Sequence, residues 1–203
     1  MKSVLFEGRS IYPTKIVCVG RNYVEHIKEL GNEMPSSMVL FMKPNSAVTD
    51  ILDSKKGSLH YEGEISFLIK DLQIAGVGFG LDLTDRALQG RLKEKGLPWE
   101  RAKAFDKAAL FSEFIAIDKD DLTNLSLKLY INAELKQEGG VELMIYKPND
   151  IISEINSFST LEDGDIVMSG TPKGVGRFNP GDRFLGEIWS GNKKLISKEW
   201  IAL

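Results

Sequence analysis

The apolar residues of this chain recur in short blocks, and most of the blocks have the length and composition of β-strands. Apolar runs occupy residues 15–20 (KIVCVG), which end at a glycine, and 38–44 (MVLFMKP), which end at a proline. Residues 59–69 (LHYEGEISFLI) alternate instead, as a strand with one buried face does. The apolar positions on that face are Tyr61, Ile65, Phe67 and Ile69.

Two segments have the periodicity and end signals of short helices. Residues 24–35 (VEHIKELGNEMP) predict a helix that Gly31 closes. Residues 149–159 (NDIISEINSFS) predict an amphipathic helix. Its expected apolar face consists of Ile151, Ile152, Ile155 and Phe158.

A Gly-rich extended stretch at residues 76–83 leads into a third helix. Thr84 is the expected N-cap, and Asp85 suits the positive first turn. Gly96 is placed as the residue just past the C-terminal end.

From about residue 126 onward the pattern is mostly that of strands. Residues 127–132 and 134–139 predict a hairpin around Asn132-Ala133. Further strands, separated by Gly-containing turns, are expected within 163–176, 181–191 and 193–203. The chain as a whole therefore predicts one β-rich α+β domain over residues 1–203, with a few short helices.

Composition narrows the class of protein. Of 203 residues, 42% are hydrophobic and 27% charged, which is an ordinary globular mixture, and the net charge of −3 without a Lys/Arg-rich block argues against a nucleic-acid partner. No apolar run is long enough for a membrane span, and the first residues lack the pattern of a secretory signal. The single cysteine, Cys18, allows no internal disulfide. We expect a cytoplasmic protein.

Two glutamates stand out in the alternating segment. Alternation places His60, Glu62 and Glu64 on one face of the expected strand. Adjacent carboxylates repel each other, which raises the pKa of at least one unless a cation lies between them. The pair therefore indicates either a divalent-metal site or a solvated strand face, on which this spacing is common.

Asp82 strengthens the first interpretation, because it lies where the Gly-rich stretch gives way to the helix. Side chains at such junctions often face crevices. Glu62, Glu64 and Asp82 together form an all-carboxylate set, which suits a hard cation such as Mg²⁺ or Mn²⁺. The alternative is that Asp82 only favours the helix N-terminus by its charge.

His26 and Glu29 lie three positions apart on the first predicted helix and are therefore neighbours. A carboxylate beside a histidine increases its basicity, so the pair could act as a general base that activates water. The same spacing also fits an exposed pair that contributes only about 0.2–0.5 kcal/mol to helix stability.

Residues 169–176 (SGTPKGVG) form a Gly-rich loop whose backbone N–H groups could bind a carboxylate. The loop matches neither the phosphate-binding nor the dinucleotide-binding glycine pattern, so no nucleotide site is expected. Lys103 is a candidate partner for a substrate carboxylate, although most lysines are simply solvated.

In combination, six stretches resemble the fumarylacetoacetate hydrolase family, most closely its acylpyruvase and oxaloacetate decarboxylase branch. They run in the same order over most of the chain: CVGRNYVEHIKEL, MVLFMKP, HYEGEISFLI, LDLTDRALQ, KGLPWERAKAFD and LEDGDIVMSGTPKGVG. One departure is Thr84-Asp85-Arg86-Ala87, where the family usually has T-A-R-D ahead of the glutamine.

The resemblance implies the mixed β-sandwich roll of this family, usually a homodimer, with one Mg²⁺ or Mn²⁺ per active site. It implies that the metal is held by Glu62, Glu64 and Asp82. It implies that water is activated by His26 and Glu29 on a mobile lid. It implies that the substrate is contacted by Arg21, Gln89, Lys103 and Thr171.

The implied reaction is hydrolysis of the bond between C3 and C4 of an acylpyruvate-type 2,4-dioxo acid, which leaves the enolate of pyruvate. Decarboxylation of oxaloacetate needs the same enolate stabilisation without an attacking water, so one site could perform both. Two alternatives remain open: an isomerase or decarboxylase of 2-hydroxyhepta-2,4-diene-1,7-dioate-type acids, and a non-catalytic metal-binding scaffold.

Overall fold

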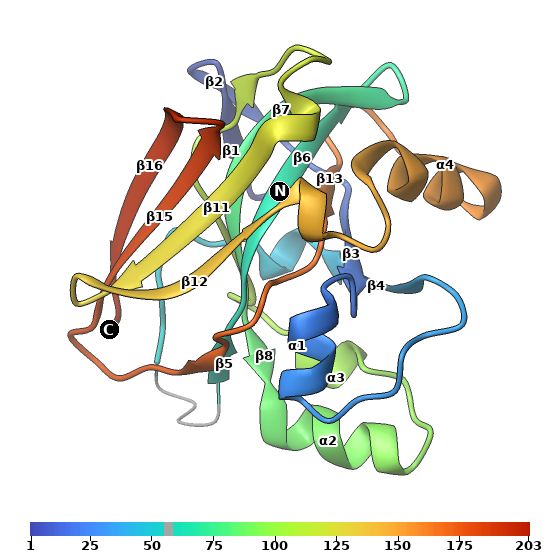
Figure 1. Ribbon diagram of the computed structural model, residues 1–203, viewed down its shortest axis with the longest axis vertical. Coiled ribbons are helices and arrows are strands. Elements are labelled where there is room, and N and C mark those ends of the chain that lie inside the picture. The colour runs from blue at the N-terminus through green and yellow to red at the C-terminus, as the bar shows by residue number, and fades with distance from the viewer. Residues whose placement is uncertain (55–58) are drawn as a thin grey trace.

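A mixed sheet runs through the middle of the computed structural model, which describes residues 1–54 and 59–203 (Figure 1). Within these residues the sheet has seven strands in the order β10-β7-β6-β13-β3-β4, with β9 also paired to β7. β13 is parallel to β3, and the other neighbours are antiparallel. The strands are β3 (Lys15–Gly20), β4 (Val39–Pro44), β6 (Gly63–Lys70), β7 (Gln73–Asp82), β9 (Ala109–Phe111), β10 (Ile115–Ala116) and β13 (Ile166–Met168).

A four-stranded antiparallel sheet, in the order β12-β11-β15-β16, packs across one face of the mixed sheet (Figure 1). Its strands are β11 (Leu125–Ile131), β12 (Glu134–Gly140), β15 (Arg183–Ser190) and β16 (Lys193–Ile201). The sheets approach closely because Gly186 has no side chain: a Cβ there would lie 2.5 Å from the Phe79 ring. The result is a β-sandwich.

Smaller elements complete the β-structure. β1 (Val4–Phe6) and β2 (Arg9–Ile11) form a hairpin. The strands β5 (Leu59–Tyr61), β8 (Thr84–Asp85) and β14 (Gly176–Arg177) form a third, short sheet in the order β14-β5-β8.

Alternation along the central strands fills a core on each face of the mixed sheet. Val17 and Val19 pack into the core shared with the four-stranded sheet, whereas Ile16 and Cys18 pack into a second core on the opposite face. The predicted apolar face of the 59–69 segment lies in the larger core, as expected. These strands are apolar on both sides because both faces of the sheet are covered.

Four α-helices lie within the described residues, and none of them is long and apolar enough to cross a membrane. They are α1 (Val24–Glu29), α2 (Arg86–Glu94), α3 (Glu100–Lys103) and α4 (Pro148–Phe158). Single 3-10 turns occur at η1 (Asn45–Ala47), η2 (Leu122–Asn124) and η3 (Val141–Leu143). Figure 1 shows α1, α2 and α3 grouped at one end of the molecule, beside β5 and β8.

The helix boundaries correct the sequence interpretation at two points. Thr84 is not the N-cap of α2: it belongs to β8, and Asp85 caps the helix by accepting a hydrogen bond from the Leu88 N–H at 3.1 Å. Phe158 does not share the buried face of α4, because it lies at the last residue of the helix and is 60% exposed.

Most other expected elements are present. Gly31 and Gly96 follow α1 and α2 with positive φ angles of 60° and 61°. The β11–β12 hairpin turns at Asn132-Ala133, where both residues have positive φ. The β-rich α+β class and the mixed β-sandwich architecture are therefore confirmed.

Candidate metal centre

Three buried carboxylates converge at the grouped-helix end of the mixed sheet. One oxygen from each of Glu62, Glu64 and Asp82 lies within 4.8 Å of the others. The register of the β6–β7 pair produces this arrangement: Glu64 pairs with Gly80, and the Asp82 N–H donates to the Glu62 carbonyl at 2.9 Å. Glu62 lies at the bend between β5 and β6, so two acids two positions apart face the end of β7.

His60 does not join this group. β5 belongs to the short third sheet, and the chain changes sheets at Glu62. The expected common face therefore continues from Glu64 to Glu62 but not to His60, which is absent both from the acid cluster and from the residues that line the pocket in the described part of the chain.

The three acids differ in how their charge is balanced. Burial raises the pKa of Glu64 well above its usual range, and repulsion from Asp82 and Glu62 raises it further. Burial has the same tendency at Glu62, but the cations of Lys103 and Arg86 outweigh it and hold the pKa of Glu62 below its usual range. A dication among the three oxygens would relieve the repulsion at Glu64, so the donor set fits Mg²⁺ or Mn²⁺.

Lys103 lies directly beside the acid triad, which consists of Glu62, Glu64 and Asp82. Its Nζ donates to Glu62 Oε2 at 2.8 Å, to Asp82 Oδ2 at 2.6 Å and to Thr84 Oγ1 at 2.5 Å, which uses all three of its N–H groups. Burial lowers the pKa of this amine, but Asp82 and Glu62 raise it by more, and the net pKa lies above its usual range. Lys103 is therefore a permanent cation rather than a base.

On the other side of the pocket, His26 and Glu29 form the pair that the sequence spacing suggested. His26 Nδ1 lies 3.1 Å from Glu29 Oε2, and the second oxygen of Glu29 accepts a hydrogen bond from the Gly174 N–H at 2.9 Å. His26 is 6% exposed and lines the pocket, whereas Glu29 contacts the His26 ring without lining the pocket. Since a carboxylate accepts the proton on Nδ1, the neutral ring has a free lone pair on Nε2.

The Gly-rich loop after β13 binds carboxylates, as the sequence suggested, but they are the protein's own. The Gly170 N–H donates to Glu64 Oε2 at 2.7 Å, and Gly174 holds Glu29. Gly170 has a φ of 100°, and a Cβ there would lie 2.8 Å from that of Asn22, so only glycine fits without strain. The loop thus positions one acid of the triad and the partner of His26.

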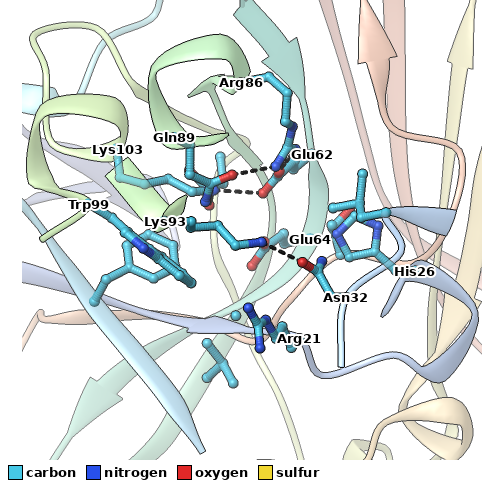
Figure 2. A pocket seen from close by; sticks show the side chains of 16 residues that line it. Arg21, His26, Asn32, Glu62, Glu64, Arg86, Gln89, Lys93, Trp99 and Lys103 are labelled. Atoms are coloured by element: carbon cyan, nitrogen blue, oxygen red, sulfur yellow. Dashed lines mark hydrogen bonds and ion pairs between the residues drawn. The ribbon is translucent and has the colours of Figure 1, made fainter. Parts of the chain in front are cut away.

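The remaining predicted substrate residues line the same pocket (Figure 2). Thr171 donates its hydroxyl hydrogen to the Gly63 carbonyl at 2.9 Å, and Gln89 Oε1 accepts a hydrogen bond from Arg86 at 2.6 Å. Arg21 has a positive φ of 57°, a backbone conformation that non-glycine residues adopt rarely.

Several residues of this site were not identified from the sequence. Lys43 is fully buried and pairs with Asp82, and Arg86 pairs with Glu62. The signal for Lys43 was present, since it is a lone charge in an otherwise apolar strand. Of the other pocket residues that went unnoticed, Phe41 lies in β4, and three lie on loops or a helix without a recognisable pattern: Asn32, Lys93 and Trp99.

Comparison with known proteins gives consistent matches. The family model described as Fumarylacetoacetate (FAA) hydrolase C-terminal matches residues 15–195. The oxaloacetate tautomerase YcgM of Escherichia coli is 42% identical over 190 residues, covering 84% of this chain and 87% of that protein. A mitochondrial oxaloacetate decarboxylase of Dictyostelium discoideum is 38% identical over 185 residues, covering 82% and 85%.

A solved structure resembles this one over its full length. The crystal structure of fumarylpyruvate hydrolase from Pseudomonas aeruginosa, in complex with Mn²⁺ and pyruvate, superposes with a TM-score of 0.88. The two chains are 29% identical, and the match covers 100% of this chain and 95% of that one.

Proposed function

Since the chain belongs to the fumarylacetoacetate hydrolase family, we propose that it is a divalent-metal-dependent enzyme that converts short 2-oxo acids through their enolates, with the keto–enol tautomerisation of oxaloacetate as its main reaction. The observation that carries this proposal is that Glu62, Glu64 and Asp82 converge in a pocket that His26 also lines. The similarity to an oxaloacetate tautomerase supports the choice of substrate.

Glu62, Glu64 and Asp82 are the proposed ligands of Mg²⁺ or Mn²⁺. When bound, the ion acts as a Lewis acid that stabilises negative charge on the oxygen of the 2-oxo group. Lys103 stays protonated beside the ligands and adds fixed positive charge at the same place. Thr171 also lines the pocket, and its hydroxyl is held in place because it accepts a hydrogen bond of 2.8 Å from Gln137 and donates to the Gly63 carbonyl.

His26 is the proposed proton carrier. In the conversion of keto to enol, the C3–H bond breaks and His26 Nε2 takes the proton. The electron pair of the broken bond forms the C2–C3 double bond, and the π pair of the C2–O bond moves onto the 2-oxo oxygen. The His26 imidazolium then returns its proton to that oxygen. Glu29 stabilises the imidazolium that forms, because its carboxylate already lies 3.1 Å from Nδ1. The reaction consumes no water and is balanced within the substrate.

Acylpyruvate hydrolysis is the second candidate function, and the His26–Glu29 pair also favours it. In that reaction His26 removes a proton from water, which attacks C4, and the C3–C4 bond breaks to leave a carboxylic acid and pyruvate. The similarity to a fumarylpyruvate hydrolase supports this alternative. Decarboxylation of oxaloacetate uses the same charge stabilisation but needs no general base.

A substrate panel tests the proposal. Enol-oxaloacetate, keto-oxaloacetate, acetylpyruvate and a dienedioate are incubated with enzyme and Mg²⁺ or Mn²⁺, with and without chelator. Ultraviolet absorbance follows the enol, and proton NMR identifies the products. We expect metal-dependent tautomerisation above the rate in buffer. If acetylpyruvate is hydrolysed faster than oxaloacetate is tautomerised, the second candidate is the main reaction. If no compound is turned over, the protein is a non-catalytic metal-binding scaffold.

A homodimer is a further part of the proposal, implied by the family resemblance. β4 forms an edge of the mixed sheet and exposes the apolar side chain of Met42 by 37%. A second copy of the chain could pack against this edge and cover it. Sedimentation velocity measures the state directly, and a mass of one chain at micromolar concentration would contradict the dimer.

A further inference from the structure

Two cations at the mouth of the pocket have no acidic partner. Arg21 and Lys93 are half-buried and line the pocket, yet neither forms an ion pair anywhere in residues 1–54 or 59–203. Three other cations near the site, by contrast, all pair with the acid triad: Lys43, Arg86 and Lys103. The deep end of the pocket is thus balanced in charge, whereas its mouth carries an excess of positive charge.

The position of Lys93 follows from the geometry of α2. Arg86, Gln89 and Lys93 are spaced by three and four residues and therefore occupy one face of the helix, which borders the pocket. Arg86, at the first turn, binds Glu62 of the triad. With a rise of about 1.5 Å per residue, Lys93 lies about 10 Å farther along the helix axis than Arg86. The face runs from the proposed metal ligands to the mouth.

The Lys93 amine has donors to spare. It contacts the side-chain oxygen of Asn32, a neutral acceptor on the segment after α1, and this contact uses one of its three N–H groups. Figure 2 shows Lys93 and Arg21 reaching toward the middle of the pocket from separate elements. Burial lowers the pKa of Lys93, and the positive charges of Arg21 and Arg86 lower it further. An anion between these groups would relieve that repulsion.

We propose that Lys93, with Arg21 beside it, determines specificity by binding the distal carboxylate of a 2-oxo dicarboxylic acid. The inference rests on the proposed function, because it assumes that the 2-oxo carboxylate end of the substrate lies at the triad. A four-carbon diacid then directs its second carboxylate away from the triad and toward the mouth. An acylpyruvate with an alkyl end would leave both cations unpaired, so the pocket prefers dicarboxylates.

Direct binding tests this preference without turnover. Protein saturated with Mg²⁺ is titrated calorimetrically with pyruvate and with 3,3-difluoro-oxaloacetate, which has both carboxylates but no hydrogen at C3. The variants are Lys93→Gln, the charge-conserving Lys93→Arg, and Lys95→Gln as a matched control, since Lys95 is exposed on the same helix end. Thermal unfolding of each variant confirms that it is folded.

We expect the wild type to bind the diacid more tightly than pyruvate. Lys93→Gln should weaken the affinity for the diacid by about tenfold, as expected for loss of a hydrogen bond between charged groups. The affinity of this variant for pyruvate should change little. Lys93→Arg should retain most of the affinity, and Lys95→Gln all of it. Equal effects of Lys93→Gln on both ligands, or none on the diacid, would overturn the inference but leave the proposed function intact. A wild type that binds neither ligand would overturn both.

Discussion

Lys43 and Asp82 form an ion pair in which Nζ lies 2.7 Å from Oδ1 and neither side chain has exposed surface. Lys43 also donates to the Leu83 carbonyl at 3.3 Å and to the Lys103 carbonyl. A single buried amine therefore joins β4, the end of β7 and α3 behind the proposed metal ligands. It fixes the orientation of Asp82 from the side that faces away from the pocket.

Lys43→Met is expected to lower the free energy of unfolding by about 3–5 kcal/mol, because it breaks a buried ion pair and leaves Lys103 as the remaining cation beside Asp82. Chemical denaturation measures the change. Lys28→Met is the control, since Lys28 forms only an exposed pair with Glu25. If both variants unfold at the wild-type denaturant concentration, Lys43 does not support the site in this way.

Glu64→Gln is expected to weaken the affinity for Mg²⁺ and Mn²⁺ by on the order of a hundredfold, because one of three anionic ligands is lost. Calorimetric titration measures it, with the exposed Glu154→Gln as control. Unchanged affinity in Glu64→Gln would exclude Glu64 as a ligand.

Metal binding by the wild type should also depend on pH. Because the pKa of Glu64 is raised, its carboxyl group in the metal-free protein stays protonated at pH values where a glutamate is usually ionised. A dication that binds there displaces this proton. Affinity should therefore increase with pH until Glu64 is ionised. Titrations in two buffers of different ionisation enthalpy count the protons released. The count should fall in Glu64→Gln; an equal count in both proteins would assign the released proton to another group.

His26→Gln is expected to reduce kcat for oxaloacetate tautomerisation by about 10²–10⁴, the usual contribution of a general base. Glu29→Gln should have a smaller effect, because Nδ1 keeps an acceptor. Glu25→Gln, on the exposed face of α1, serves as control. In His26→Gln, kcat for acetylpyruvate hydrolysis should fall more than kcat for oxaloacetate decarboxylation, because only hydrolysis needs an activated water. Equal losses of kcat in the two assays would show that His26 does not activate water.

Asp165→Asn tests the anchoring of the start of β13, the strand that leads to Gly170. Asp165 accepts hydrogen bonds from Thr14, from the Lys15 amide and amine, and from the Glu162 amide. Burial tends to raise the pKa of Asp165, but the Lys15, Glu162 and Thr14 bonds outweigh it and lower the pKa. The ionised group therefore stabilises the fold fully above the usual Asp pKa of about 4, and the contribution is lost as the pH falls through the lowered pKa.

We expect Asp165→Asn to cost about 1–3 kcal/mol at neutral pH. The difference from the wild type should shrink below about pH 4. Denaturation curves at several pH values measure it, with the exposed Asp118→Asn as reference. A difference that does not change with pH would mean that the charge of Asp165 contributes nothing.

Much of the architecture could be predicted from local pattern. The unbroken apolar run that became β3 reflects burial of both faces of that strand, and the alternation that became β6 expresses a strand's period of two. The glycines after α1 and α2 occupy backbone conformations that favour glycine. The N-cap of α2 was misplaced by one residue because Thr84 and Asp85 both suit a cap, and only the hydrogen bond from the Leu88 N–H to the Asp85 side chain distinguished them.

The sequence by itself determined the strands, the short helices and the acidic and basic residue types, since these depend on neighbours within a few positions. It also carried the collinear motifs that indicated the family. Tertiary structure alone decided which distant charges meet: Lys43 comes to Asp82 from β4, Gly170 to Glu64 from the loop after β13, and Lys93 to the mouth beside Arg21. Side-chain charges interact through space, so no periodicity along the chain can assign their partners before the sheets and helices have packed.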